Sequence, residues 1–279
     1  EYLDLYAKSG AMILGHNHTE YKKKLSLAIG RVMCTDNSLL DLRVLEKMKE
    51  RIPSCDMVRV GLSGTEIVQN ALRLARAFTK KNKIIRFYGH YHGNADNMLT
   101  GSKIHTCSEQ TVHLNQATGS LGIVADVDDQ LLMAEWNDFD GIEQLIRRHH
   151  EQTAAVITEP IGVNTGGIMP REGFLSFLKE LCEKYHIVLI FDEIITGFRV
   201  SGGGAQELFQ VIPDLACYGK SLGGGGLPIS ALVGKQDIMS LYDTYQAVHG
   251  GTFNGYPLGM AAIDATLDIL SHDGLYYQM

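Results

Sequence analysis

One lysine stands alone in a long uncharged part of this 279-residue chain. Between Asp214 and Lys235 the only charged residue is Lys220, and a glycine-rich turn follows it. Burial among apolar residues disfavours the charged ammonium and lowers its pKa, which makes a lysine a usable nucleophile or base near neutral pH. The same pattern also fits a lysine whose stem packs against the protein while its head reaches water. The stretch marks Lys220 as a candidate catalytic residue and leaves the second interpretation open.

The end of a predicted strand lies upstream of this lysine. Residues 186–191 read HIVLIF, a continuous apolar run that is typical of a central parallel strand covered on both faces. Asp192 and Glu193 follow directly. Ligands of open α/β sheets bind beyond the carboxyl ends of the strands. We therefore expect the two carboxylates at a binding edge of the sheet.

Strands and helices alternate along the chain. Strands are predicted at 56–62, 83–87, 154–158, 186–191, 213–218 and 229–233, and helices at 19–29, 38–51, 63–78, 139–150, 174–185 and 258–270. This alternation predicts an α/β fold, in which helices cover both faces of a mainly parallel sheet in three αβα layers. Residues 101–127 lack periodicity and are predicted to form a functional or mobile loop.

The first fifty residues carry a histidine pair and two helix signals. His16 and His18 form an HxH pair, but no third ligand lies near them, so we interpret them as solvated loop histidines and predict no metal site. Thr19 is the predicted N-cap of the first helix. The second helix is supported by an apolar residue at every third position: Leu39, Leu42, Leu45 and Met48.

A capping pattern opens the helix after the first predicted strand. The strand runs directly into SGTE, where Ser63 and Glu66 have the spacing of a capping box. The free N–H groups of Gly64, Thr65 and Glu66 then lie at the positive end of a helix, with the hydroxyls of Ser63 and Thr65 as further donors. This is an anion site, although a capping box without a ligand has the same sequence.

Polar residues also follow two other predicted strands. Tyr91 lies between two histidines, His90 and His92, just past strand 83–87. An aromatic ring at this edge could stack on a flat ligand, or it could be a packing residue. Glu159 and Asn164 follow strand 154–158. These side chains are expected to meet at the same edge of the sheet.

Two nucleotide-binding motifs do not match this sequence. Gly219, Lys220 and Ser221 resemble the end of a Walker A motif, but the first glycine of that motif would fall at Asp214, and the glycines here follow the lysine. A GxGxxG segment that opens a helix after a strand is also absent.

Charge and cysteine content limit the partners. The net charge is −7, and the short basic clusters at 22–24 and 80–83 are too small for a nucleic-acid surface, so nucleic acid is not expected as a partner. The five cysteines include no CxxC pair, which favours a reducing compartment and a cytoplasmic location. The sequence has no signal-peptide pattern and no apolar run long enough to span a bilayer, so no membrane association is expected.

The candidate residues form one set when they are taken together. An anion site at a helix start, an aromatic after a strand, an acid at a strand end and an isolated lysine are what pyridoxal 5'-phosphate requires. The acid keeps the pyridine nitrogen protonated, so that the ring accepts electrons from the substrate carbon. The lysine holds the aldehyde as a Schiff base, and is then placed to move a proton.

Six segments resemble the class III aminotransferases in order and spacing. They read SGTE, FYGHYHGNAD, EPIGVNTGGIMP, IFDEIITGFRV, YGKSLGGGGLP and HGGTFNGYP, and the resemblance extends from Met12 to Leu270. The chain is most similar to the glutamate-1-semialdehyde aminomutase branch of this family. The resemblance implies the large domain of a pyridoxal-phosphate-dependent transferase of fold type I.

The resemblance also implies roles for individual residues. Gly64 and Thr65, with Ser63, would hold the phosphate, and Tyr91 would stack on the pyridine ring. Asp192 would pair with the ring nitrogen. The remaining cofactor contacts implied are Ile194 on the opposite face of the ring, Lys220 as the Schiff-base lysine, Asn164 near the cofactor, and His92 beside the stacking aromatic, with its role open.

Other implied roles concern support and assembly. Glu159 and Glu193 match acidic positions that support the site. Thr252 matches a threonine that reaches the phosphate of the neighbouring subunit, which implies a homodimer. Residues 1–15 are expected to be an N-terminal segment that leads into a large domain, 16–279. The small C-terminal domain of the family is missing from this chain, and both ends suggest a fragment of a longer protein.

Two departures concern the branch of the family. HNHTE lacks the usual proline, and Asn94 replaces the second histidine of the family's YHGH segment. Both weaken an assignment to the aminomutase itself. The leading hypothesis is an aminotransferase that moves an amino group between an amine or amino acid and an oxo acid or aldehyde. The alternatives are an intramolecular aminomutase and a non-catalytic relative that binds the cofactor.

Overall fold

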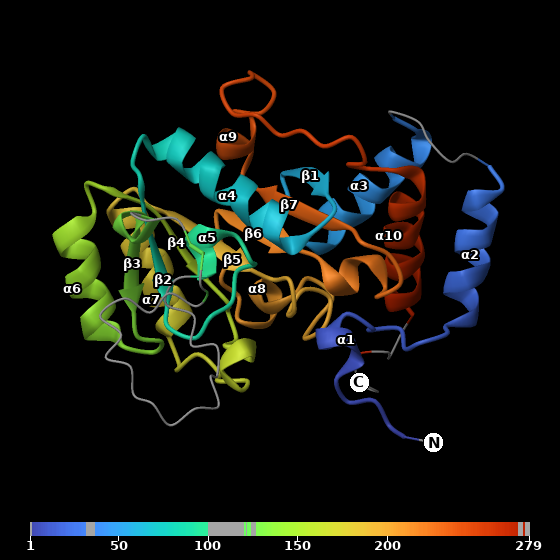
Figure 1. Ribbon diagram of the computed structural model, residues 1–279, viewed down its shortest axis with the longest axis horizontal. Coiled ribbons are helices and arrows are strands. Elements are labelled where there is room, and N and C mark those ends of the chain that lie inside the picture. The colour runs from blue at the N-terminus through green and yellow to red at the C-terminus, as the bar shows by residue number, and fades with distance from the viewer. Residues whose placement is uncertain are drawn as a thin grey trace.

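A twisted sheet runs through the centre of the computed structural model, which describes residues 2–31, 37–99, 120, 122, 123, 127–272 and 276 (Figure 1). Within these residues the sheet has seven strands in the order β1-β7-β6-β5-β4-β2-β3. Neighbours from β6 to β3 are parallel, whereas β7 is antiparallel to both β1 and β6. The strands are β1 (Met57–Gly61), β2 (Lys83–Phe87), β3 (Leu131–Ala134), β4 (Thr153–Thr158), β5 (Val188–Asp192), β6 (Leu215–Tyr218) and β7 (Ser230–Gly234).

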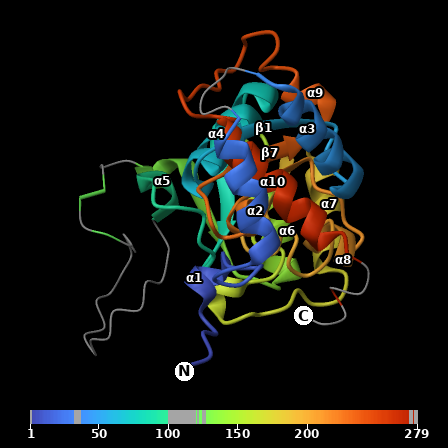
Figure 2. The same cartoon turned by 90° about the vertical axis from the view of Figure 1, so that its right-hand side faces the viewer.

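Helices cover both faces of this sheet. One face packs against α4 (Gly64–Thr79) and α9 (Gln236–Met239), and the other packs against α3 (Leu39–Arg51), α6 (Phe139–His149), α7 (Phe174–Lys184) and α10 (Pro257–Leu270). Helix α2 (Thr19–Ile29) lies outside α10 (Figure 2). The short helical segments are α1 (Ala7–Gly10), α5 (Asp96–Leu99), α8 (Ala205–Leu208), η1 (Val127–Gln130), η2 (Val163–Thr165) and η3 (Lys220–Gly223).

The sheet forms two cores because side chains alternate along each strand. In β5, Val188 and Ile190 face α4, whereas Leu189 and Phe191 belong to the cluster on the opposite face. Every residue of β4 to β7 is buried. Strands that are buried on both faces read as continuous apolar runs, which explains why these strands were visible in the sequence. The predicted αβα arrangement with a mainly parallel sheet is confirmed.

Several local predictions need correction. The N-cap of α2 is His18, whose ring accepts the Tyr21 N–H, and not Thr19. In α3 the apolar spacing located the helix, but Leu39 and Leu42 are exposed, and Val44 and Met48 form its buried face. The short strand β3 was not predicted, because its four residues directly follow an irregular polar segment. Most of the predicted loop 101–127 lies outside the described residues.

The described helices include none that is long and apolar enough to cross a bilayer. The described residues also contain no group of three or more histidine, cysteine, aspartate or glutamate side chains that could hold a metal ion. His16 instead pairs with Asp4 on the surface, at 2.8 Å.

Candidate active site

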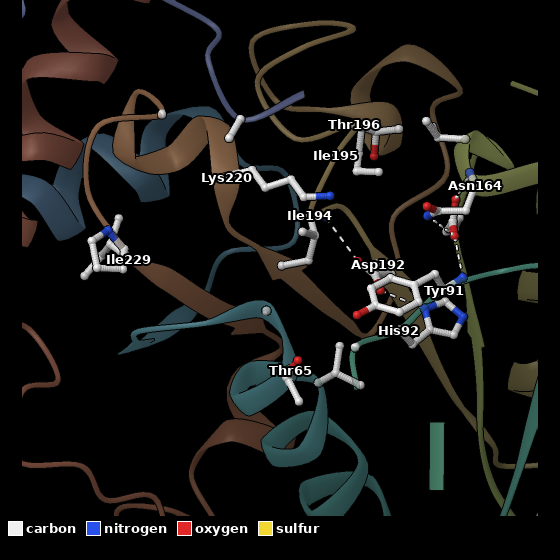
Figure 3. Close-up of a pocket in the computed structure, with 18 of the residues that line it drawn as sticks. Thr65, Tyr91, His92, Asn164, Asp192, Ile194, Ile195, Thr196, Lys220 and Ile229 are labelled. Carbon is white, nitrogen blue, oxygen red and sulfur yellow. Dashed lines mark hydrogen bonds and ion pairs between the residues drawn. The ribbon is translucent and has the colours of Figure 1, made fainter. Parts of the chain in front are cut away.

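A cavity of about 380 Å³ opens beyond the carboxyl ends of β2, β4 and β5 (Figure 3). Its walls come from the start of α4, the loops after these strands, and the turn after β6. The cavity brings together nine of the twelve candidate residues: Gly64, Thr65, Tyr91, His92, Glu159, Asn164, Asp192, Ile194 and Lys220. Ser63, Glu193 and Thr252 do not line it.

Lys220 enters the cavity from the turn that follows β6. It begins η3 with a left-handed φ of 43°, a conformation that is strained for a residue with a side chain. Its amine points toward Asp192 and Tyr91 (Figure 3). Burial lowers the pKa of this lysine, although the nearby carboxyls of Asp192 and Glu159 oppose the shift. Lys220 is half-buried in the wall of this cavity, and its role there stays a prediction.

The glycines after Lys220 fix the turn against the start of the chain. A side-chain carbon at Gly225, where φ is +81°, would lie 2.5 Å from the Ala11 carbonyl oxygen. The Tyr21 hydroxyl donates to the Gly223 carbonyl at 2.5 Å. Residues larger than glycine cannot approach this closely, so the glycine run is needed to pack the lysine turn on the N-terminal segment.

Asp192 ends β5 and is almost completely buried, with 5% of its surface exposed. One carboxylate oxygen accepts the Ile194 N–H at 3.1 Å, and the other lies 2.7 Å from His92 Nδ1. Burial raises the pKa of Asp192 to about 7. Burial also lowers the pKa of His92 to about 3, so His92 is a neutral ring that donates its Nδ1–H to the carboxylate.

The buried carboxyl of Asp192 predicts a pH-dependent stability for the cofactor-free protein. Because its folded pKa of about 7 lies above the ordinary 3.8, stability is lost as pH rises between these values, by at most roughly 4 kcal/mol. We expect cofactor-free Asp192→Asn to match the wild type near pH 4 and to unfold at higher urea concentration at pH 8. Equal urea midpoints at pH 8 would show that the carboxylate is not destabilised in the fold.

Glu159 connects Tyr91 and Asn164. Its Oε1 accepts the Tyr91 backbone N–H and the Asn164 side-chain amide, both at 2.7 Å, and its Oε2 accepts the Asn164 backbone N–H at 3.1 Å. Burial raises the pKa of Glu159, while these donors and His92 oppose the shift. The carboxylate holds both loops, and the Tyr91 ring lies in front of Asp192 and His92 (Figure 3).

The start of α4 offers two backbone donors to the cavity. The Ser63 hydroxyl accepts the Glu66 N–H at 3.2 Å, as predicted, but the Glu66 carboxylate turns to the Leu62 N–H at 3.0 Å instead of completing the capping box. Within the described residues, the N–H groups of Gly64 and Thr65 donate to no acceptor. An anion at this helix start would therefore be held by the backbone.

Asn94 engages the hydroxyl of Thr65. The hydroxyl donates to the Asn94 side-chain oxygen at 3.0 Å and accepts the Asn94 backbone N–H at 3.2 Å. Gly93 allows this contact, because a side-chain carbon there would lie 2.7 Å from the Thr65 hydroxyl oxygen. This departure from the family pattern therefore joins the Tyr91 loop to the turn at the start of α4.

Ile194 packs across the cavity from Tyr91. Side-chain carbons at Gly64 and Gly219 would lie 3.1 and 2.9 Å from its Cδ1 atom. The absence of side chains at these two glycines makes room for Ile194 to turn into the cavity. Tyr91 and Ile194 both line the space above Asp192, which leaves a slot for a flat ring (Figure 3).

Glu193 faces away from the cavity and holds the loop that follows β5. It is fully buried, and its carboxylate accepts the Thr196 hydroxyl and the backbone N–H groups of Ala205 and Gln206, at 2.5 to 2.9 Å. Glu193 does not line the cavity, and its role as a support of the site stays a prediction.

We expect Glu193→Ala to destabilise the protein by about 3–5 kcal/mol, because it leaves three buried donors without an acceptor. The urea midpoint of the full-length protein measures this loss. Glu193→Gln keeps one acceptor oxygen, so its urea midpoint should fall clearly less than that of Glu193→Ala. Equal midpoints for Glu193→Ala and the wild type would contradict the anchoring role.

The structure adds residues that the sequence did not single out. Arg199 donates to the Gly10 carbonyl and to Ser221, and its charge lowers the pKa of Lys220. It lies in the quoted IFDEIITGFRV segment, but nothing in the spacing indicated a contact with the lysine turn. Thr252 lies on an exposed loop, so its role at a neighbouring subunit stays a prediction. Apolar residues that line the cavity and to which the sequence gave no role include Ala11, Ile161, Val163, Ile195, Leu227 and Ile229.

The residues present fit pyridoxal 5'-phosphate. The cavity combines an amine whose pKa is lowered, a buried carboxylate, a slot between Tyr91 and Ile194, and unpaired backbone donors at a helix start. Each feature matches one part of the cofactor: the aldehyde, the ring nitrogen, the ring faces and the phosphate.

Comparison with known proteins gives the same family along the whole chain. The family model "Aminotransferase class-III" matches residues 1–279. A glutamate-1-semialdehyde 2,1-aminomutase from Syntrophobacter fumaroxidans is 41% identical over 282 residues, which cover 99% of this chain and 62% of that protein.

Solved structures of transaminases are also similar. An omega-transaminase from Sphaerobacter thermophilus has a TM-score of 0.88 at 33% identity and covers 96% of this chain and 62% of its own. A transaminase with PLP bound has the same TM-score at 27% identity, over 98% of this chain and 63% of that one. This chain thus spans a little under two thirds of these proteins. The shared architecture confirms the predicted fold type I of pyridoxal-phosphate-dependent transferases.

Proposed function

Because this chain belongs to the class III aminotransferase family, we propose that the protein containing it transfers an amino group with pyridoxal 5'-phosphate bound in the cavity described above. The donor is an amine or amino acid, and the acceptor is an oxo acid or aldehyde. The observation that carries this proposal is the placement of Lys220 and Asp192 in one cavity beneath the Tyr91 ring. When bound, the cofactor acts as an electron sink for the carbon next to the transferred nitrogen.

We assign the binding roles by position in the cavity. The backbone N–H groups of Gly64 and Thr65 bind the phosphate, with Ser63 capping the same helix start. Tyr91 and Ile194 cover the two faces of the ring. Asn164, which Glu159 fixes, contacts the edge of the cofactor. These groups orient the cofactor and exclude water from it.

Two side chains carry the chemistry. Lys220 binds the cofactor through its amine, and the same amine then moves a proton at the substrate carbon, because burial keeps its pKa below the usual value. Asp192 accepts a hydrogen bond from the protonated ring nitrogen, and His92 holds the carboxylate in place from the other side. The positive charge on that nitrogen compensates the cost of burying the Asp192 carboxylate.

The test of this function uses the full-length protein. We expect purified protein to retain pyridoxal phosphate, and borohydride reduction to attach it to Lys220, as located by peptide mass spectrometry. An amine donor alone should then release an oxo product in a single turnover. Protein that binds no pyridoxal phosphate when reconstituted would disprove the proposal, and retained cofactor without any half-reaction would favour a non-catalytic binding protein.

A second reaction is favoured by the identity of one relative. The protein from Syntrophobacter fumaroxidans is named a glutamate-1-semialdehyde 2,1-aminomutase, and it is 41% identical to this chain. An aminomutase moves the amino group within one substrate and needs no separate donor. Turnover of glutamate 1-semialdehyde by the pyridoxamine phosphate form, without added donor, would establish this alternative. A strict requirement for a donor would establish the transaminase.

We also propose a homodimer in the cytoplasm, in which Thr252 contacts the phosphate of the neighbouring subunit. Tyr245, Val248 and Phe253 lie near Thr252 in sequence and expose large apolar surfaces, which supports an interface there. Three cysteines of the described chain, Cys55, Cys182 and Cys217, are free thiols, which supports a reducing compartment.

Mixed dimers test the contact across subunits. Thr252→Ala and Lys220→Ala subunits should each give weakly active or inactive homodimers. In the mixed dimer, one site has its own Lys220 and receives an intact Thr252 from the other subunit, so we expect activity to return to about half. No recovery on mixing would place Thr252 outside the neighbouring site.

A further inference from the structure

His90 is a buried histidine that none of the steps above uses. Its exposed surface is 0%, and it lies one residue before Tyr91. Its Nδ1 accepts the backbone N–H of Glu159 at 3.1 Å, so the ring proton resides on Nε2. Burial, together with electrostatic interactions with His92 and Arg86, lowers the pKa of His90 to about 2. The ring is therefore neutral, and Nδ1 stays an acceptor at every pH at which the enzyme works.

His90 and Glu159 form a reciprocal pair of contacts between two loops. His90 belongs to the loop after β2, and its ring accepts a backbone N–H from the loop after β4. Glu159 belongs to the loop after β4, and its carboxylate accepts the Tyr91 backbone N–H from the loop after β2, at 2.7 Å. Strands β2 and β4 are neighbours in the sheet. We call this pair of contacts the loop clasp.

The surroundings of His90 fix the ring in the orientation that the loop clasp needs. Arg86 donates to the His90 carbonyl at 2.5 Å. The Trp136 ring lies across the imidazole, with centroids 4.8 Å apart and planes at 60°. Phe87 packs on it from a further direction, at 5.5 Å. A ring held by its backbone and by two aromatic neighbours has little freedom to turn Nδ1 away from Glu159.

We propose that His90 is a positioning residue, which fixes Glu159 through its backbone and thereby sets Tyr91 and Asn164 at the cofactor. The proposal deepens the function proposed above and rests on it. Without the Nδ1 acceptor, the buried N–H of Glu159 is left unpaired. Of the two contacts in the loop clasp, only the one between the Tyr91 N–H and the Glu159 carboxylate then remains. The Glu159 carboxylate then shifts, and it carries the Tyr91 backbone and the Asn164 amide with it.

Two substitutions in the full-length holoenzyme separate the acceptor from the ring. His90→Asn places an amide oxygen near the position of Nδ1, so it keeps the acceptor and loses the ring. His90→Phe keeps an aromatic ring of similar size and loses the acceptor. We expect His90→Phe to raise the dissociation constant of pyridoxal phosphate and to lower kcat, each by at least about tenfold. His90→Asn should stay within about threefold of the wild type in both.

A control variant tests whether packing alone explains the effect. Phe139→Leu loosens the neighbouring aromatic cluster, where Phe139 contacts Phe174 and Phe177, and leaves the rings that the proposal places around His90 and both acceptors of the loop clasp unchanged. We expect it to lower the thermal midpoint while leaving the pyridoxal phosphate dissociation constant and kcat within about twofold. The proposal is overturned if His90→Phe binds cofactor and turns over like the wild type. It is also overturned if His90→Asn is as impaired as His90→Phe.

The outcome for the wild type keeps the two proposals distinct. If wild-type holoenzyme binds pyridoxal phosphate and turns over, the function stands whatever the His90 variants do. If it fails to bind the cofactor, the function falls. The loop clasp is then tested by the urea midpoints alone. His90→Phe must lower the urea midpoint more than His90→Asn does. If it does not, the proposed contact is wrong.

Discussion

Lys220→Ala should lower the rate of amino-group transfer by about 10⁴-fold or more, because it removes both the covalent hold on the cofactor and the proton-moving amine. Proton transfer by a positioned group alone accounts for about 10²–10⁴-fold. We expect pyridoxal phosphate to bind the variant without a covalent bond, since the contacts at Gly64, Thr65, Tyr91 and Asp192 are unchanged. Single-turnover measurements with an amine donor check the rate, and borohydride reduction followed by mass spectrometry checks the attachment.

A second lysine provides the control for this variant. Lys184→Ala removes an exposed amine at the end of α7, outside the cavity, and should leave the rate unchanged. Added methylamine should restore part of the activity of Lys220→Ala, because a small amine can enter the space left by the side chain and move the proton. Near-normal turnover in Lys220→Ala without added amine would refute the catalytic role of this residue.

The parts of this molecule that the sequence predicted are those in which local chemistry determines the structure. The apolar run 186–191 gave β5 and placed Asp192 at its end, because a strand buried on both faces has no polar positions. Ser63 caps α4 as expected, since its hydroxyl bonds within the same turn. The isolation of Lys220 in the sequence reflects the burial of the residues that follow it, Ser221, Leu222 and Gly223.

Contacts between distant segments could not be predicted in this way. The apolar spacing in α3 located a helix, but only the packing of that helix against the core decides that Val44 is buried and Leu42 exposed. The bond from the Glu159 backbone to His90 joins residues 69 positions apart and depends on β2 and β4 being neighbours. No local pattern encodes such a pairing. Glu193 is similar, because two of its partners, Ala205 and Gln206, lie in the short helix α8, which the sequence did not predict.

Asp192→Asn should bind pyridoxal phosphate and slow amino-group transfer by about 100- to 1,000-fold. The asparagine has the same shape and can still accept the Ile194 N–H, so we expect the cavity to keep its form. It carries no negative charge, so the ring nitrogen of the cofactor is no longer held in its protonated state. The electron sink is then weaker at the step in which the proton leaves the substrate carbon. A primary isotope effect with a donor deuterated at that carbon should increase in the variant.

A matched substitution shows whether the loss comes from the position of the charge or from any buried carboxylate. Asp214 also lies at the sheet, where Lys179 and Lys235 contact it at 2.7 Å and its carboxylate accepts the Leu189 N–H at 2.8 Å, away from the cavity. Asp214→Asn should lower the urea midpoint and leave kcat nearly unchanged. Asp192→Asn should do the reverse: it should lower kcat in the holoenzyme and raise the urea midpoint of the cofactor-free protein at pH 8, because without the cofactor the buried carboxylate is unfavourable to the fold. A normal rate in Asp192→Asn would show that the ring nitrogen takes no part in the reaction.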